Sequence, residues 1–414
     1  MTASALTRLL TDSTDSSIGQ PTEQICILGG GFGGLYTALR LSQLPWLTAQ
    51  KPQIVLVDQS DRFLFLPLLY ELVTGELQTW EIAPPFEELL AETGIRFVQA
   101  SVSQIDLSQR QVELGNGQTL NYDRLVLALG GETPLDQVPG AAEHALTFRA
   151  ITDAYRLEEK LRALEESTAE KIRIVVVGAG PSGVELACKL GDRLGQRGRI
   201  RLVDRNDQIL QASPPFNQTA AKTALEQREI WIDLETIPVE LAAGKIWLEY
   251  KSQVDEIPVD IVLWTVGTAI APAIRQLPLA HNERGQLTTT TTLQLIDHPE
   301  IFALGDLADC RDAEGQQVPS TAQAAFQQAD YVGWNLWAGL TDRPLLPFQY
   351  SHLGEMLTLG VDSAALSGLG IKLDGPLASL VRRLAYLYRM PTLEHQLKVG
   401  FNWILRPFLA SIPR

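Results

Sequence analysis

A strand, a glycine-rich turn and a helix follow one another twice in this chain, and this repeat limits the fold more than any other feature. The two turns read Gly29-Gly-Gly-Phe-Gly-Gly34 and Gly178-Ala-Gly-Pro-Ser-Gly183. Each copy continues to a second apolar run that ends in an acid, Asp58 or Asp204. In a GxGxxG turn the first glycine allows the sharp bend, the second lets the backbone approach a pyrophosphate, and the third lets the helix pack on the strand. Two such units predict an α/β fold with two Rossmann-like dinucleotide-binding domains.

Two dinucleotide sites in one chain favour a tightly held flavin, FAD, and a diffusing nicotinamide cofactor. The acid after the second strand of such a unit hydrogen-bonds a ribose, so Asp58 is predicted to serve FAD and Asp204 to serve NADH. Arg205 follows Asp204 directly. Its guanidinium is suited to a 2′-phosphate, so NADPH stays an alternative. The competing interpretation of both acids is a solvated strand end.

The order of these units predicts how the chain is divided. We expect a mobile, Ser/Thr-rich tail at 1–20, an FAD domain formed by 21–150 and 286–350, an NAD(P)H domain at 151–285 and a C-terminal region at 351–414. The first unit is too small to be complete, so the apolar run 301–306 is expected to return to it. Asp306 ends that run, where a carboxylate can hold the ribityl hydroxyls of a flavin. An ordinary turn is the alternative.

Composition excludes several classes of function. Lys and Arg number 34 against 49 Asp and Glu, and the net charge of −15 argues against nucleic acid as a partner. Cys26, Cys188 and Cys310 lie far apart and the five histidines show no metal-binding spacing, so neither a disulfide framework nor a metal site is expected. No stretch approaches the roughly 18 apolar residues of a spanning helix.

The C-terminal region has a pattern of its own. Apolar residues recur there at helical spacing: Leu377, Leu380, Val381, Leu384, Leu387 and Tyr388, then Leu397, Phe401, Ile404, Leu405 and Phe408. Arg382, Arg383 and Arg389 lie off the first stripe, and the region is basic. This pattern predicts two helices lying in a membrane leaflet with their basic residues on head groups, or else ordinary packed helices. Truncation after Leu373 is then expected to release the protein from membranes and to spare activity in solution.

Motifs along most of the chain carry a family resemblance. They are the two glycine turns, Leu66-Pro-Leu-Leu-Tyr-Glu-Leu-Val-Thr-Gly75, Trp264-Thr-Val-Gly267, Leu304-Gly-Asp306 and Thr321-Ala-Gln-Ala-Ala-Phe-Gln-Gln328. The last is similar to the AQxAxQQ signature of type II NAD(P)H:quinone oxidoreductases, which are single-subunit FAD enzymes that do not pump protons. The chain resembles most the cyanobacterial and plastid branch, which is linked to demethylphylloquinone reduction in phylloquinone synthesis and to prenylquinones such as plastoquinone.

The resemblance implies a set of site residues. The cofactor-binding set is Gly29, Gly31, Phe32, Gly33, Gly34, Asp58, Gly130, Gly178, Gly180, Pro181, Ser182, Gly183, Asp204, Arg205, Gly267, Asp306, Ala322 and Gln323. Within it, Ala322 and Gln323 are expected near the flavin ring. Glu185 is expected to position the nicotinamide carboxamide or to relay a proton, and a plain helix acid is the alternative. Gln327 and Gln328 are expected at the quinone end.

The resemblance also implies the reaction and its setting. NAD(P)H would pass a hydride to the flavin, and a quinone arriving from the opposite side would take two electrons. A peripheral membrane protein on the cytoplasmic side of a cyanobacterial thylakoid or plasma membrane is expected. Members of the family often dimerise, which leaves a homodimer open.

Three other functions remain as alternatives. A flavin disulfide reductase or a sulfide:quinone reductase needs cysteines beside the flavin. A soluble ferredoxin or rubredoxin reductase has no use for a basic, apolar C-terminus. A sensor that binds both nucleotides would show no turnover.

Overall fold

The computed structural model describes residues 23–47 and 51–410, with side chains as far as residue 405. Within them the first lobe is built on a sheet with the strand order β17-β18-β7-β1-β2-β3. Its strands are β1 (Gln24–Leu28), β2 (Gln53–Asp58), β3 (Arg96–Gln99), β7 (Arg124–Leu127), β17 (Gln294–Leu295) and β18 (His298–Ala303). All pairs are parallel except β17 with β18. The chain therefore returns to this sheet at β18.

Alternate residues of β1 enter two different cores, and this explains the layers of the first lobe. Ile25 and Ile27 pack with α1 (Phe32–Gln43) and with α9 (Ala322–Leu340), whereas Cys26 and Leu28 pack toward a small antiparallel sheet. That sheet is β4 (Val102–Asp106), β5 (Gln111–Leu114) and β6 (Thr119–Asn121). A strand that is apolar on both faces needs both faces covered, as the continuous run 25–28 requires.

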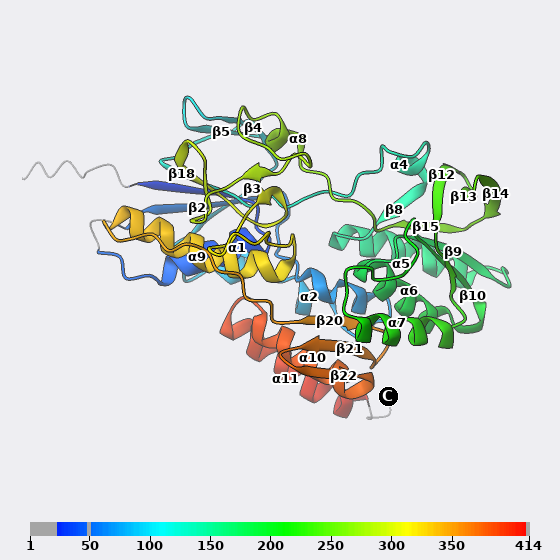
Figure 1. Ribbon diagram of the computed structural model, residues 1–414. Coiled ribbons are helices and arrows are strands. Elements are labelled where there is room, and N and C mark those ends of the chain that lie inside the picture. The colour runs from blue at the N-terminus through cyan, green and yellow to red at the C-terminus, as the bar shows by residue number, and fades with distance from the viewer. Residues whose placement is uncertain (1–22, 48–50, 411–414) are drawn as a thin grey trace, which may run out of the picture.

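The second lobe repeats this plan. Its parallel sheet has the order β11-β10-β9-β15-β8, with helices on one face and the antiparallel β12-β13-β14 sheet on the other (Figure 1). The strands are β8 (Ala145–Thr147), β9 (Ile172–Val177), β10 (Gly198–Val203), β11 (Trp231–Asp233), β12 (Thr236–Ala242), β13 (Lys245–Tyr250), β14 (Gln253–Pro258) and β15 (Ile261–Trp264). The main helices are α5 (Ile151–Glu166), α6 (Pro181–Leu194) and α7 (Pro215–Gln227).

We propose that the chain crosses between the lobes earlier than the predicted boundaries at 150 and 286. β8 pairs with β15 of the second lobe, while Ile274 on α8 (Pro272–Arg275) is packed in the first lobe. We propose that the crossings lie near Glu132 and Ala269, which form a two-way backbone bridge. The difference arises because β8 is too short to show a periodic pattern in the sequence.

The C-terminal region lies below both lobes and against each of them (Figure 1). It begins with an antiparallel sheet, β20 (Glu355–Thr358), β21 (Ala364–Gly368) and β22 (Ile371–Asp374). Two helices follow, α10 (Gly375–Arg389) and α11 (Leu393–Ala410). No helix in the described residues is long and apolar enough to cross a membrane.

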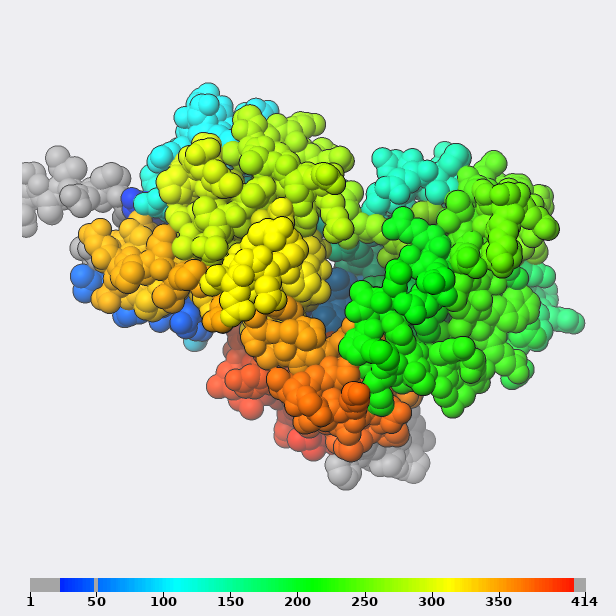
Figure 2. Space-filling view, viewed as in Figure 1, coloured from blue at the N-terminus to red at the C-terminus, as the bar shows by residue number. Residues whose placement is uncertain are grey.

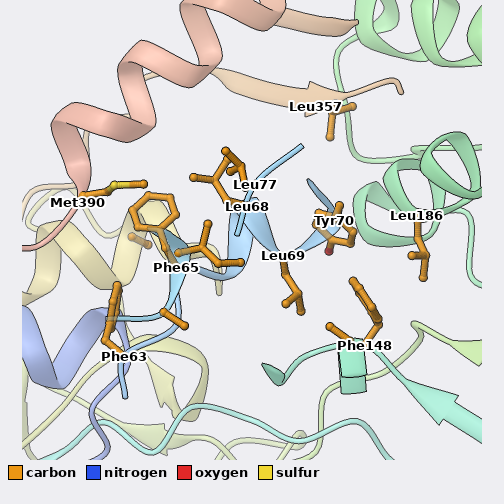
Figure 3. Packing of buried hydrophobic residues seen from close by; sticks show 14 of the residues in the cluster. Phe63, Phe65, Leu68, Leu69, Tyr70, Leu77, Phe148, Leu186, Leu357 and Met390 are labelled. Atoms are coloured by element: carbon orange, nitrogen blue, oxygen red, sulfur yellow. The ribbon is translucent and has the colours of Figure 1, made fainter. Parts of the chain in front are cut away.

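One stretch of the first lobe meets all three parts of the molecule. It contains a 3-10 helix (Leu66–Leu72) and the loop that leads to α2 (Thr79–Ile82), and residues 66–78 are called the junction segment below. Figure 3 shows Tyr70 of this segment between residues of the second lobe and of the C-terminal region, including Leu186 and Leu357. The other short elements include α3 (Phe86–Leu90), α4 (Ala141–His144), β16 (Leu287–Thr288) and β19 (Ala308–Asp309).

Candidate functional site

The two glycine turns have the same geometry. A Cβ on Gly34 would lie 1.7 Å from the carbonyl oxygen of Gly29, and a Cβ on Gly183 would lie 1.7 Å from that of Gly178. The third glycine is therefore required in both copies for the helix to pack on the strand. A Cβ on Gly31 or Gly180 would meet nothing within 4 Å. The middle of each turn is thus open, as the approach of a pyrophosphate requires.

The helix that follows each turn offers free N–H groups. α1 and α6 begin directly after Gly31 and Gly180, and neither N-terminus has a side-chain cap or an acid in its first turn. Pro181 occupies the first position of α6, where a missing N–H costs nothing. A helix start of this kind binds the phosphates of a dinucleotide. Both turns therefore fit the pyrophosphate of a dinucleotide, and the assignment of FAD to the first turn and NAD(P)H to the second stays a prediction.

The two acids occupy equivalent positions and brace the turns. Asp58 Oδ2 accepts a hydrogen bond from Gly30 N and Asp204 Oδ2 one from Ala179 N, each at 2.6 Å. Their other oxygens accept from Ser60 N and Asn206 N, each at 2.8 Å. Burial raises the pKa of Asp58, and these N–H groups offset only part of that effect. The ribose contacts of both acids stay predictions.

Asp306 lies at the crossing between the lobes. Its Oδ2 lies 3.1 Å from a guanidinium nitrogen of Arg149, and the preceding Gly305 N donates to Gln328 Oε1 at 2.8 Å. Gly130 and Gly267 have positive φ angles of 68° and 83° near the same crossing. A Cβ on Gly131 would lie 2.3 Å from Thr268 Cγ2 and 3.7 Å from Asp306 Cβ, so the residues that follow Gly130 and Gly267 lie beside Asp306. Arg149 had no motif of its own, so sequence reasoning missed it.

Glu185 is buried on α6, with 6% of its surface exposed. Its Oε1 accepts a hydrogen bond from Thr358 N at 2.9 Å, and a guanidinium nitrogen of Arg382 lies 3.7 Å away. Burial raises the pKa of Glu185 to about 7, against the opposing effects of Arg382 and the Thr358 N–H. It lies beyond the first turn of α6, which weakens the alternative of a plain helix-dipole acid. At neutral pH this carboxyl can both hold and release a proton.

The glutamines of α9 are engaged with the chain itself. Gln323 Oε1 accepts from the Tyr350 hydroxyl and from Leu353 N, and the Gln327 amide exchanges two hydrogen bonds with the Ser351 backbone. Gln328 is buried at 2% exposure. Ala322 begins α9 directly after the Thr321 cap. These contacts tie α9 to the start of the C-terminal region, and the flavin and quinone roles of Gln323, Gln327 and Gln328 stay predictions.

Two arginines of α10, Arg382 and Arg383, pair with acids of the junction segment, where the sequence suggested contacts with lipid head groups. Arg382 is 2% exposed and pairs with Glu71 of the junction segment. Arg383 pairs with Glu76 of the same segment, and the Arg389 guanidinium lies 4.6 Å from the centre of the Phe326 ring. Glu71 and Glu76 therefore hold Arg382 and Arg383 against the junction segment. Truncation after Leu373 would remove these partners, so we no longer expect it to spare soluble activity.

The three cysteines lack the features of reactive thiols. Cys26, Cys188 and Cys310 are all free and buried. Burial raises the pKa of Cys26 and Cys188 to about 12 and that of Cys310 to about 11, so each stays a protonated thiol at neutral pH. Thiolates are the reactive form. This argues against the disulfide-reductase and sulfide:quinone reductase alternatives.

A cleft separates the two lobes, and the C-terminal region closes its lower end (Figure 2). Both glycine turns lie in parallel-sheet lobes that flank it. Among the described residues there is no group of three or more His, Cys, Asp or Glu side chains arranged to hold a metal ion. The site therefore consists of two open glycine turns, the buried Glu185 carboxyl with a pKa of about 7, and the glutamine-rich helix α9.

This fold and these turns define a flavoprotein of the pyridine nucleotide-disulphide oxidoreductase family, to which the chain belongs, with residues 23–329 matched. The resemblance to type II NAD(P)H:quinone oxidoreductases is confirmed by two curated relatives. The chain is 59% identical over 388 residues to the demethylphylloquinone reductase NdbB of Synechocystis, covering 93% of this chain and 96% of that protein. It is 45% identical over 430 residues to the alternative NAD(P)H-ubiquinone oxidoreductase C1, chloroplastic/mitochondrial, of Arabidopsis thaliana, covering 94% and 82%.

A solved structure agrees with this assignment of the fold. NDH2 from Plasmodium falciparum in complex with NADH superimposes with a TM-score of 0.82 at 16% identity, covering 93% of this chain and 98% of that one. The predicted fold class and the predicted cofactors, FAD with NADH or NADPH, are confirmed. The predicted site residues and the choice between the two nicotinamide cofactors stay predictions.

Proposed function

We propose that this chain transfers a hydride from NAD(P)H, by way of FAD, to a membrane prenylquinone without pumping protons, with demethylphylloquinone as its acceptor. The observation that carries this proposal is the 59% identity with a demethylphylloquinone reductase over nearly the full length of both chains. The paired open turns supply the two dinucleotide sites that the reaction needs. Plastoquinone is the second acceptor to be tested.

In this proposal the first lobe holds FAD and the second holds NAD(P)H. Bound FAD supplies the capacity to take two electrons as a hydride and to release them to a quinone. The residues of the chain bind and orient: the open turns at Gly31 and Gly180 admit the two pyrophosphates, Asp58 and Asp204 hold those turns in shape, and Asp306 lies at the crossing. Buried residues of the junction segment exclude water from the contact between the lobes.

Glu185 is the group that we assign to proton handling. It is buried, it titrates near neutral pH, and it lies on the helix that follows the second glycine turn. Quinone reduction consumes protons, and a positioned acid with a pKa near the working pH can supply one. Arg382 and the Thr358 N–H hold the carboxyl in place.

We also propose peripheral membrane association through the outer faces of α10 and α11. Leu377, Leu380, Leu384 and Tyr388 are each more than half exposed on α10, and so are Leu393, Leu397, Phe401 and Ile404 on α11. A contiguous apolar face of this size is unfavourable in water, and such faces mark sites of contact with a protein or a membrane. Phe408 lies outside the residues whose side chains the structure describes. A prenylquinone dissolved in the bilayer would reach the protein on this side.

The reaction is tested by purifying the protein with its flavin and mixing it with NADH or NADPH in a stopped-flow instrument. Reduced protein is then mixed with one of four electron acceptors: a demethylphylloquinone analogue, which is a naphthoquinone, a plastoquinone analogue, a persulfide or a ferredoxin. We expect fast flavin reduction and fast reoxidation by the naphthoquinone. Reoxidation by ferredoxin alone would refute the proposal in favour of a soluble reductase.

Glu185→Gln is expected to lower the rate of quinone reduction about 10- to 100-fold, because a positioned acid contributes at least that much. The wild-type rate should fall as pH rises through 7, where the carboxyl loses its proton, and the variant should lack this dependence. Steady-state rates between pH 5.5 and 8.5 measure both effects. Because the folded protein binds this proton more tightly than the unfolded chain, wild-type stability should also fall as pH rises from 4.5 to 7. An unchanged pH profile in the variant would assign Glu185 to packing alone.

Asp204→Ala is expected to weaken NADH binding by about 1–3 kcal/mol through the loss of a hydrogen bond to a charged group. NADPH should lose less, because the repulsion between carboxylate and 2′-phosphate disappears as well. Arg205→Ser is the matched variant: its side chain is exposed, no partner for it occurs among the described residues, and only NADPH should weaken. Equilibrium titrations with both nucleotides measure this. If Asp204→Ala weakens NADH and NADPH binding equally, Asp204 only stabilises the glycine turn and does not select between the nucleotides.

A further inference from the structure

A cluster of three charged side chains joins the three parts of the molecule. Glu76 belongs to the junction segment of the first lobe, Lys189 to α6 of the second lobe and Arg383 to α10 of the C-terminal region. The Lys189 ammonium donates to Glu76 Oε2, and a guanidinium nitrogen of Arg383 donates to Glu76 Oε1 at 2.6 Å. We call these three residues the Glu76 ion cluster. The same guanidinium lies 3.7 Å from the exposed carboxylate of Asp362.

The cluster is buried enough to be rigid. The side chains of Lys189, Glu76 and Arg383 are 1%, 11% and 27% exposed. Burial alone would raise the pKa of Glu76, but Lys189, with help from Thr74 and Arg383, outweighs it and holds this pKa below its usual value. Glu76 is therefore ionised at neutral pH and held by both cations. Breaking a buried pair is strongly unfavourable, so the three elements keep a fixed relation.

α6 is the helix on which this restraint has the largest consequence. It begins at the second glycine turn, carries Glu185, and carries Lys189 one turn later on the same face. Holding Lys189 therefore holds the N-terminal turn of α6 relative to the first lobe. The distance and orientation between the two glycine turns decide how a nicotinamide meets a flavin. Misplacement by about 1 Å can cost on the order of 100-fold in rate.

Arg383 extends this restraint to the outer helix. It leaves α10 on the inward side, while Leu380 and Leu384 on the same helix face outward. The helix with the exposed apolar face is thus attached to the contact between the lobes. Leu77 of the junction segment, Met390 just after α10 and Leu186 of α6 belong to one buried apolar cluster, which Figure 3 shows in part.

We propose that the Glu76 ion cluster fixes the second lobe against the first, and that Arg383 is thereby a positioning residue for the oxidation of NAD(P)H. The inference rests on the proposed placement of FAD in the first lobe and NAD(P)H in the second. The inference gives α10 a part in the oxidation of NAD(P)H, in addition to the membrane contact proposed for its outer face. Arg383 acts through Glu76 and touches neither nucleotide.

Arg383→Gln is the primary test, because Lys189 and Glu76 stay paired and the fold is kept. The flavin-loaded protein is mixed anaerobically with increasing NADH in a stopped-flow instrument, with no quinone present. We expect the limiting rate of flavin reduction to fall about 10-fold or more, with flavin content unchanged and the apparent Kd for NADH within about twofold. Arg383→Lys should restore the rate to within about threefold. Hydrogen exchange on the same loaded protein should rise in residues 73–78 and in the first two turns of α6.

A second variant removes both buried charges together. Glu76→Gln with Lys189→Met leaves no fully buried charge unpaired, because Arg383 is 27% exposed and keeps the Asp362 carboxylate at 3.7 Å. The double variant should therefore fold, and it should show the same loss in limiting rate as Arg383→Gln. Lys245→Gln breaks an exposed ion pair with Glu256 and serves as the control without effect. An unchanged limiting rate in Arg383→Gln, or a Lys variant as slow as the Gln variant, would overturn the proposal. Because no quinone is present, failure of the proposed acceptor would appear separately, as normal reduction followed by no reoxidation.

Discussion

Replacing Leu380, Leu384, Phe401 and Ile404 by serine is expected to release the protein from anionic lipid vesicles. These residues are 53%, 54%, 65% and 66% exposed. Burying each of them in a membrane leaflet would stabilise the bound state by roughly 1–1.5 kcal/mol. Together they amount to about 5 kcal/mol, which is more than a thousandfold in partition coefficient. Co-sedimentation with vesicles of phosphatidylglycerol and neutral lipid measures the effect.

The same substitutions should leave the folded protein intact, because they touch no inward contact of α10 or α11. Thermal stability and turnover with a short-chain quinone are therefore expected to stay within experimental error. Turnover with a long-tailed quinone in liposomes should fall. Ile237→Ser with Val254→Ser, on the antiparallel sheet of the second lobe, provides the matched control at 42% and 51% exposure. If the quadruple variant still sediments fully with vesicles, the outer faces of α10 and α11 are not the membrane contact.

Arg382→Met is expected to destabilise the protein by about 3–5 kcal/mol, because it leaves the Glu71 carboxylate buried without its cation. Glu71 is 1% exposed, and Arg382 also donates to the Pro67 carbonyl oxygen at 2.6 Å. The thermal midpoint should fall by about 3–6 °C. Differential scanning calorimetry of the flavin-loaded protein measures this.

Two further variants separate the charge from its packing. Glu71→Gln combined with Arg382→Met removes both charges and should recover most of the loss, since a buried pair replaced by neutral groups is often nearly neutral in stability. Arg162→Met breaks an exposed pair with Glu166, at 74% exposure on each side, and should change the midpoint very little. No recovery in the double variant would show that Arg382 acts through its stem and not through its charge.

Local chemistry made part of this site predictable. The glycine turns could be recognised because each requirement, from the sharp bend to the open middle, falls within six consecutive residues. Asp58 and Asp204 follow at the expected distance because each strand that they end pairs directly beside the strand before its turn. Their hydrogen bonds to the turn backbone were not predicted, because a sequence gives the spacing of an acid but not which atoms it faces.

Contacts between distant segments were not predictable. The sequence pattern correctly separated the arginines of α10 from its apolar stripe, and the error lay in what they face. Arg382 meets an acid 311 positions earlier in the chain, and a single sequence contains no signal for such a pairing. Strand β8 was not predicted, because three residues are too few for a periodic pattern. Lys189 could have been noticed, since it lies one turn after Glu185 on the same face of α6.

Glu81 of α2 is fully buried, and its Oε1 accepts hydrogen bonds from Asn402 and from the Trp403 indole, both on α11. His395 also contacts the Glu81 carbonyl oxygen at 2.8 Å. These partners are separated from Glu81 by more than 300 residues. A ribosome that makes the chain from the N-terminus therefore releases Glu81 long before anything exists to bury it with. The packing around Glu81 therefore stays incomplete until α11 has left the exit tunnel. The apolar outer faces of α10 and α11 emerge at the same late stage, when the other parts of the protein are already available to fold.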